Sequence, residues 1–118
     1  MIPKFRIFDK KKKRFLGDFT MEIDKFGIHV LDEFNYVVDE DDRVLMQSTG
    51  LHDVNGKEIF EGDIVKYWEN IGYIEFYQGS WVINWNDGSL FDLYDNDNNL
   101  EVLGNIHEHS GLLKENGE

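Results

Sequence analysis

Apolar residues that recur at every second position constrain this chain more than any other feature. β-branched and aromatic side chains alternate with polar ones over many short segments, for example Thr20 to Asp24 and Trp81 to Trp85. This period of two is typical of β-strands with one buried face. In the second half, turn residues follow one another every ~8–12 residues, a spacing that favours a small barrel or sandwich. We therefore predict an all-β fold with little helix.

The expected strands fall into two groups without a linker between them. The first group contains a hairpin with a charged tip and ends near residue 46; the second group is the more regular. We predict an N-terminal β-hairpin lobe over residues 1–46 and a C-terminal lobe with an SH3-like small barrel over residues 47–118. Expected strands cover residues 5–8, 14–16, 20–24, 27–31 and 43–47 in the first lobe, and 63–68, 71–78, 81–85, 90–93 and 100–106 in the second.

Closely spaced glycines mark the segment 47–63, where we expect a connector with little regular structure. Asn55-Gly56 predicts a type I′ turn, in which both central residues have positive φ. Asp53 and Asp63 are placed where a short carboxylate can accept neighbouring backbone N–H groups. We interpret the segment as a structural corner. The alternative is a ligand site built from Gln47, Thr49, Asp53 and Glu61.

The residues of this segment form a long motif, LMQSTGLHDVNGKEIFEGDIV, over positions 45–65. This motif resembles the signature of the YopX family of phage and prophage proteins. Lys4 to Asp9 resembles the N-terminal strand of the family, and Glu101 to Glu108 resembles its closing strand, so the resemblance covers essentially the whole chain. Ser48 departs from the usual aromatic residue, and His109-Ser110 departs from a common Asn-Pro.

The resemblance implies a β-rich, often oligomeric product of a phage or prophage gene. It implies no established activity. The expected compartment is the cytoplasm of a bacterial host, because no apolar run approaches the ~20 residues that span a bilayer and the N-terminus lacks the apolar core of a signal peptide.

Charge is distributed unevenly along the 118 residues. The net charge is -12, yet residues 1–14 carry seven basic residues against one acidic residue, which leaves -18 on the remainder. We interpret the basic edge as a solvated hairpin tip; the alternative is that it docks on an acidic face of a neighbouring subunit. Nucleic acid is a disfavoured partner, because the acidic remainder opposes phosphate contacts. The basic candidates for an interface are Lys10, Lys11, Lys12, Lys13 and Arg14.

Aromatic residues crowd the predicted barrel. Because both faces of its strands carry rings, some must point outward, and large exposed apolar patches usually mark interfaces. Lys66 is the basic residue among them, so a subunit interface explains the surplus better than base stacking does. The candidate interface residues are Trp68, Trp81 and Trp85.

No motif indicates a metal or a cofactor. The chain lacks cysteine, and the pair His107 and His109, which a strand would place on one face, is too small for a zinc site. Asp95 to Asn99 lacks the later glycine and glutamate of a calcium loop, so we expect a solvated loop there and another at Asp39 to Asp42. We predict no bound metal and no cofactor.

The sequence shows neither a phosphate-binding loop nor a nucleophile elbow, so we expect no enzyme. We expect an accessory protein that acts by binding and self-association, with a second copy or a host or phage protein as partner and no membrane contact. Two alternatives stay open. One is an acidic mimic of DNA that occupies a DNA-binding groove of a host factor, and the other is a small barrel that binds nucleic acid directly.

Overall fold

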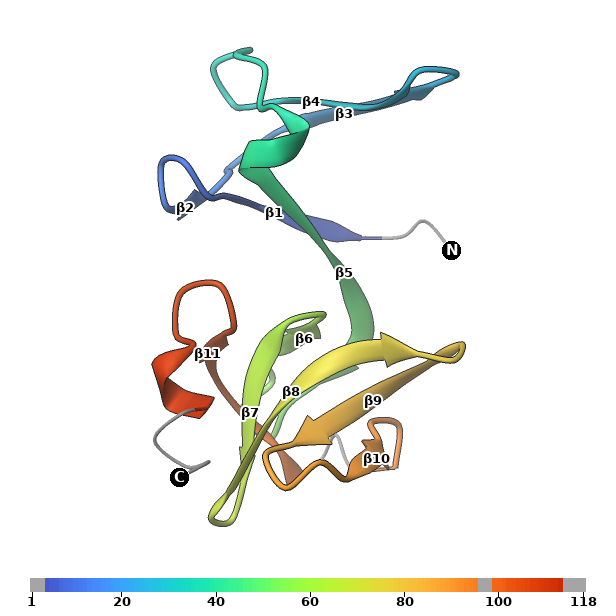
Figure 1. The fold of residues 1–118 in the computed structure, drawn as a ribbon, viewed down its shortest axis with the longest axis vertical. Helices are drawn as coiled ribbons and strands as arrows, with labels where there is room; N and C mark the ends of the chain where they lie inside the picture. Colours follow the sequence, from blue (N-terminus) through green and yellow to red (C-terminus); the bar gives the residue numbers. More distant parts are fainter. Residues whose placement is uncertain (1–3, 96–98, 114–118) are drawn as a thin grey trace. The chain divides into compact units, whose positions relative to one another are not determined.

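The computed structural model describes residues 4–95 and 99–113, and strands dominate it (Figure 1). The all-β prediction is confirmed. Helical geometry is confined, among the described residues, to the 3₁₀ turn η1 (Glu40–Asp42), residue 99 and residues 111–113. The strands are β1 (Phe5–Asp9), β2 (Arg14–Phe15), β3 (Thr20–Asp24), β4 (Gly27–Leu31), β5 (Arg43–His52), β6 (Glu58–Phe60), β7 (Asp63–Tyr67), β8 (Asn70–Tyr77), β9 (Ser80–Trp85), β10 (Leu90–Asp92) and β11 (Glu101–Asn105).

The chain divides into two compact units, Met1–Met46 (unit 1) and Gln47–Glu118 (unit 2). Unit 1 contains two antiparallel hairpins. β1 pairs with β2 through Phe8 and Phe15, and β3 pairs with β4 as a separate two-stranded ribbon. Apolar side chains from both hairpins and the following loop form its core, which consists of Ile7, Leu16, Val30 and Val38.

The prediction of little regular structure at 47–63 is wrong. β5 continues as a strand to His52, and β6 pairs with it. The sheet that contains them has the order β2-β1-β5-β6. Gly50 lies at a shift of register between Ser48 and His52, with a φ of +79°. A glycine in this left-handed conformation forms a bulge that re-aims the strand without ending its pairing.

The turn at Asn55-Gly56 is present, but its type differs from the prediction. Gly56 has a φ of +81°, whereas Asn55 is not among the residues with positive φ. The Gly56 N–H donates to the Asp53 carbonyl at 3.0 Å, which closes a turn over Asp53 to Gly56. The loop is therefore a turn followed by one left-handed glycine, a three-residue hairpin connection, instead of a type I′ turn.

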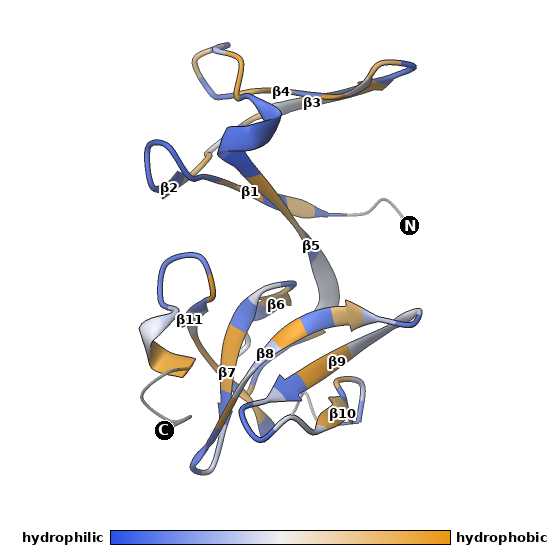
Figure 2. Cartoon of the chain, in the orientation of Figure 1, coloured by the Kyte–Doolittle hydropathy of each residue, from blue (hydrophilic) through white to orange (hydrophobic). Residues whose placement is uncertain are grey.

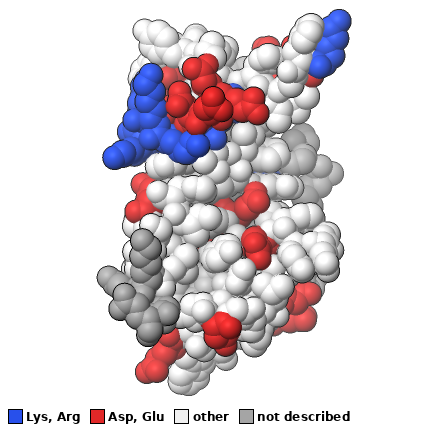
Figure 3. Space-filling model, viewed as in Figure 1, with Lys and Arg blue, Asp and Glu red and all other residues white. Residues whose placement is uncertain are grey.

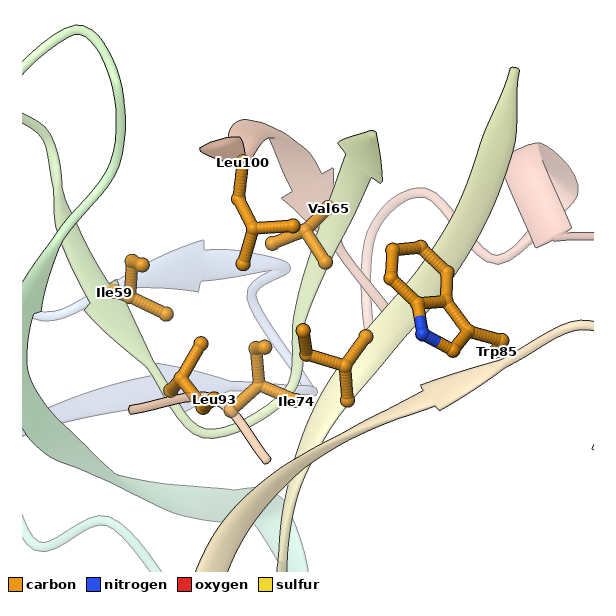
Figure 4. Packing of buried hydrophobic residues seen from close by; sticks show 7 residues of the cluster. Ile59, Val65, Ile74, Trp85, Leu93 and Leu100 are labelled. Carbon is orange, nitrogen blue, oxygen red and sulfur yellow. The ribbon is translucent and has the colours of Figure 1, made fainter. Parts of the chain in front are cut away.

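Unit 2 is built around one antiparallel sheet of order β10-β9-β8-β7-β11. Hydrophobic and hydrophilic residues alternate along its central strands (Figure 2). The sheet curls as a half-barrel with β10 and β11 at its edges, and closure into an SH3-like barrel stays a prediction. Its core, shown in Figure 4, consists of Ile59, Val65, Ile74, Ile83, Trp85, Leu93 and Leu100.

Two hairpin turns of this sheet lie one residue earlier than predicted. Tyr67 pairs with Asn70 and Tyr77 with Ser80, so the loops are Trp68-Glu69 and Gln78-Gly79. Gln78 and Gly79 both have positive φ, as does Trp68 at +58°. The cross-strand register decides these positions, and it moves Trp68 out of its predicted strand into a turn.

Candidate interaction sites

The basic edge of unit 1 is a fixed turn between β1 and β2. Asp9 Oδ1 accepts the backbone N–H groups of Lys11 and Lys12, each at 3.0 Å. The Lys10 N–H donates to the Asp42 carbonyl at 2.8 Å. On the face drawn in Figure 3, one group of basic residues lies beside a group of acidic ones, and a second basic group lies apart at the upper right.

Two of the five basic candidates are engaged within unit 1. Arg14 donates to both Glu33 carboxylate oxygens, at 3.1 and 2.6 Å, and Lys12 Nζ lies 4.0 Å from Oδ2 of the buried Asp32. The Arg14 hydrogen bonds, with a further bond from the Gly17 N–H, lower the pKa of Glu33 to about 2. The hydrogen bonds to Glu33 in turn raise the pKa of Arg14.

The other three lysines of the turn are exposed: Lys10, Lys11 and Lys13. Within the part of the chain that the structure describes, no ion pair to their side chains is found. Lys13 has a φ of +57°, so the turn holds it in the left-handed conformation. These three ammonium groups are therefore the part of the basic edge that can meet a partner.

The two units differ strongly in formal charge. Over its full sequence, unit 1 has nine basic and ten acidic residues, whereas unit 2 has three basic and fourteen acidic residues. The net charges are -1 and -11, so nearly all of the negative charge of the protein belongs to unit 2. The exposed lysines thus project from a nearly neutral unit.

The three tryptophan candidates occupy different environments. Trp68 is 78% exposed at its turn, with its ring edge-on to Tyr67 at a centroid distance of 6.2 Å. Trp81 is half-buried and packs against the core and against Phe76. Trp85 is only 6% exposed and lies in the core, as Figure 4 shows. Trp68 and Trp81 can contact a partner, and Trp85 has a packing role.

Trp81 also lines a cavity of about 260 Å³ in unit 2. Asp92 at the end of β10 and Tyr94 just after it line the same cavity, and Asp92 Oδ1 accepts the Tyr94 N–H at 2.9 Å. Tyr94 is 77% exposed, so its ring is open to solvent. Sequence reasoning missed this site because its residues come from three strands; the remaining lining residues are Thr49, Leu51 and Ser80.

The predicted acceptor role of the two corner aspartates is confirmed. Buried Asp53 accepts N–H groups from Asn55, Lys57 and Val102 at 2.8–2.9 Å, and Asp63 accepts the N–H of Phe60 at 2.8 Å. Burial raises the pKa of Asp53, but these backbone bonds outweigh it and the net shift is downward. A short carboxylate thus joins the turn after β5 to β11.

The other members of the polar corner also bond to the chain around them. Thr49 Oγ1 donates to the Ile59 carbonyl at 2.7 Å and accepts the Leu51 N–H at 3.1 Å. The Glu61 N–H donates to the Gln47 carbonyl at 2.9 Å. The geometry of Gln47, Thr49, Asp53 and Glu61 therefore favours the structural corner over a ligand site.

The histidine pair lies after the end of β11, at a turn, and not on a strand that would place both rings on one face. His109 Nδ1 accepts the Asn105 N–H at 3.1 Å, which ties the ring to the turn. Over residues 4–95 and 99–113, no group of three metal-ligating side chains is found. Residues 40–42 of the expected acidic loop form η1, and residues 96–98 of the expected loop at 95–99 lie outside the described residues.

Together, these observations define a small all-β protein of two units. Unit 1 carries the basic turn at residues 10–14, and unit 2 carries the tryptophans and most of the negative charge. A family model described as YopX protein matches residues 4–114. The crystal structure of protein EF1440 from Enterococcus faecalis aligns with this chain at a TM-score of 0.63 and 30% sequence identity. The alignment covers 96% of this chain and 99% of that one. The chain belongs to the YopX family.

Protein yopX from Bacillus subtilis has the same fold. Its crystal structure aligns with a TM-score of 0.67 at 18% identity and covers 92% of this chain and 95% of that one. No curated protein matches the sequence. Among the described residues, no helix has the length and apolar character needed to cross a membrane.

Proposed function

We propose that the protein is a phage or prophage accessory protein that acts in the bacterial cytoplasm by binding and self-association, without catalysis. The observation that carries this proposal is the charge division between the units, -1 against -11, with the exposed lysines of the 10–13 turn on the nearly neutral one. Complementary charges on one chain favour association between copies and set its orientation.

Exposed apolar side chains support the same function. In unit 1, the β3–β4 ribbon carries Ile23 (72% exposed) and Phe26 (81% exposed), and Phe34 and Tyr36 are exposed in the following loop. Unit 2 adds Trp68 at its turn. Large apolar side chains left in water are unfavourable, and where they gather they usually mark a binding surface.

Light scattering at micromolar protein tests the proposal at two salt concentrations, about 50 and 500 mM. The expected result is a mass above one chain at low salt and a lower mass at high salt, since salt screens contacts between exposed charges. A mass of one chain at both concentrations would overturn the proposal.

The acidity of unit 2 favours a second candidate function, that of an acidic mimic of DNA. Fourteen acidic residues against three basic ones could occupy a DNA-binding groove of a host factor, with carboxylates in place of phosphates. A pull-down from bacterial lysate at low salt, with and without competing DNA, tests it. Recovery of a DNA-binding protein that DNA displaces supports mimicry, and recovery of none counts against it.

A further inference from the structure

The cavity of unit 2 has the chemistry of a site for an organic cation. Trp81 and Tyr94, two electron-rich aromatic residues, line it together with Asp92, which supplies a negative charge. A cation gains from contact with the ring faces of such residues, most of all with tryptophan. Phe76 packs edge-on against the Trp81 indole at a centroid distance of 4.9 Å. The backbone N–H of Tyr94 donates to Asp92 Oδ1 at 2.9 Å, which orients the carboxylate.

An occupant of matching chemistry is present on the chain itself. Lys10, Lys11 and Lys13 are exposed on a turn whose backbone is held by Asp9, and each ends in a flexible ammonium group. A lysine side chain is long enough to enter a cavity of about 260 Å³ while its turn stays outside. Unit 2, which contains the cavity, carries the net charge of -11 that attracts such a turn.

We propose that the cavity lined by Trp81, Asp92 and Tyr94 receives a lysine of the 10–13 turn from a second copy of this chain. This inference rests on the proposed self-association and specifies its contact. The two surfaces differ, so the contact joins copies head to tail. Each copy then offers one turn and one cavity, and the assembly extends until it closes into a ring or grows as a filament.

Two variants disable the two halves of this contact separately. Tyr94→Lys removes one aromatic face and places a positive charge at the cavity, while it keeps the backbone N–H that Asp92 accepts. Its matched control is Val54→Lys, which adds the same charge at an exposed position of unit 2 outside the cavity. We expect Tyr94→Lys to weaken association by about tenfold or more, and Val54→Lys to leave it near the wild-type value.

The turn is disabled by replacing Lys10, Lys11 and Lys13 together with glutamate. Lys25→Glu is the control, because Lys25 is an exposed lysine on the separate β3–β4 ribbon. The triple variant is expected to lose association and the control to keep it. Circular dichroism of every variant checks that the strands are retained, so that a lower mass is not due to unfolding.

Mixing the two disabled variants gives the decisive measurement. The turn of Tyr94→Lys is intact and the cavity of the triple variant is intact, so their mixture can form one contact and no more. Analytical ultracentrifugation is expected to show each variant alone near one chain, and the mixture at the mass of a pair. Mixtures that stay at one chain would overturn the inference.

The remaining outcomes separate this inference from the proposed function. If wild type associates and both disabled variants keep its mass, the inference fails and self-association stands. If wild type itself has the mass of one chain, both fail. A competing alkylammonium ion such as N-acetyl-lysine methylamide provides an independent check, because it should dissociate wild type and should bind Tyr94→Lys at least about tenfold more weakly.

Discussion

Unit 1 and unit 2 reach a similar strand content by different means. The core cluster of unit 1 has four buried apolar residues, with Phe8 and Met46 buried outside the cluster, and charged side chains link the segments of this unit. The core of unit 2 has seven buried apolar residues and is enclosed by a continuous five-stranded sheet. A small core buries little apolar surface, so polar contacts must hold a larger share of unit 1 together.

Two arginines show how unit 1 does this. Arg14, at the start of β2, is bonded to Glu33 beyond the end of β4. Arg43 donates to the carbonyls of Ile28 and Val38, both at 2.8 Å, and so connects β5 to the ribbon and to the loop after it. In unit 2 the comparable link is Asp53, a buried carboxylate that accepts backbone N–H groups.

This contrast predicts that cavities destabilise unit 2 more than unit 1. Ile83→Ala should lower the free energy of unfolding by about 4 kcal/mol, and Ile7→Ala by about 3 kcal/mol, because the smaller unit collapses more readily around the missing atoms. All three tryptophans lie in unit 2, so their fluorescence in urea reports that unit, while far-UV circular dichroism reports both. A larger loss for Ile7→Ala, detected by circular dichroism, than for Ile83→Ala, detected by fluorescence, would contradict the comparison.

Asp53 tests whether unit 2 also depends on a polar link. Asp53→Ala leaves three backbone N–H groups without their acceptor and should cost about 3 kcal/mol in the tryptophan-detected free energy of unfolding. Asp87→Ala is the matched control, since Asp87 bonds only within its own exposed turn to Ser89 among the described contacts, and its effect should be much smaller. Equal effects would show that the hydrogen bond from the Val102 N–H of β11 to Asp53 contributes nothing to the free energy of unfolding.

The smallest expected effect is the acid sensitivity of unit 1. The Arg14 hydrogen bonds hold the pKa of Glu33 at about 2, below its ordinary 4.5. A carboxyl with a lowered folded-state pKa stabilises the fold above pH 4.5, and this contribution is lost as the pH falls from 4.5 to 2, because the unfolded chain takes up the proton first. Glu33→Gln should therefore flatten the fall in melting temperature between pH 5 and 3, detected by circular dichroism.

Tryptophan fluorescence supplies the control for this titration. Because it reports unit 2, its pH dependence should be the same in wild type and Glu33→Gln. An unchanged circular dichroism profile in the variant would mean that the ion pair with Arg14 makes no net contribution, as is common for exposed pairs.

Local patterns in the sequence predict several elements well. The expected strands at 20–24 and 27–31 coincide with β3 and β4, because alternation on both sides of a short turn determines a hairpin locally. The acceptor roles of Asp53 and Asp63 are equally local, since a short carboxylate reaches N–H groups two to four residues away.

Errors occur where a distant strand decides the outcome. Gly50 indicates a break, yet pairing with β6 carries β5 through it as a bulge. The turn at Trp68 depends on the register between β7 and β8, which the chain around it does not show. Trp68 and Trp85 each end a strand that the sequence predicts. Only the packing of the folded sheet leaves Trp68 exposed and buries Trp85 in the core.

By itself, the sequence determined the strand-rich class, the family motif and the separation of a basic edge from an acidic remainder, because alternation, turn residues and charge are properties of neighbouring residues. The tertiary structure alone decided which charges are neutralised within a unit, which tryptophans reach solvent, and where Trp81, Asp92 and Tyr94 meet around one cavity. Such contacts join residues from different strands, and the geometry that brings them together exists only once the sheet has formed.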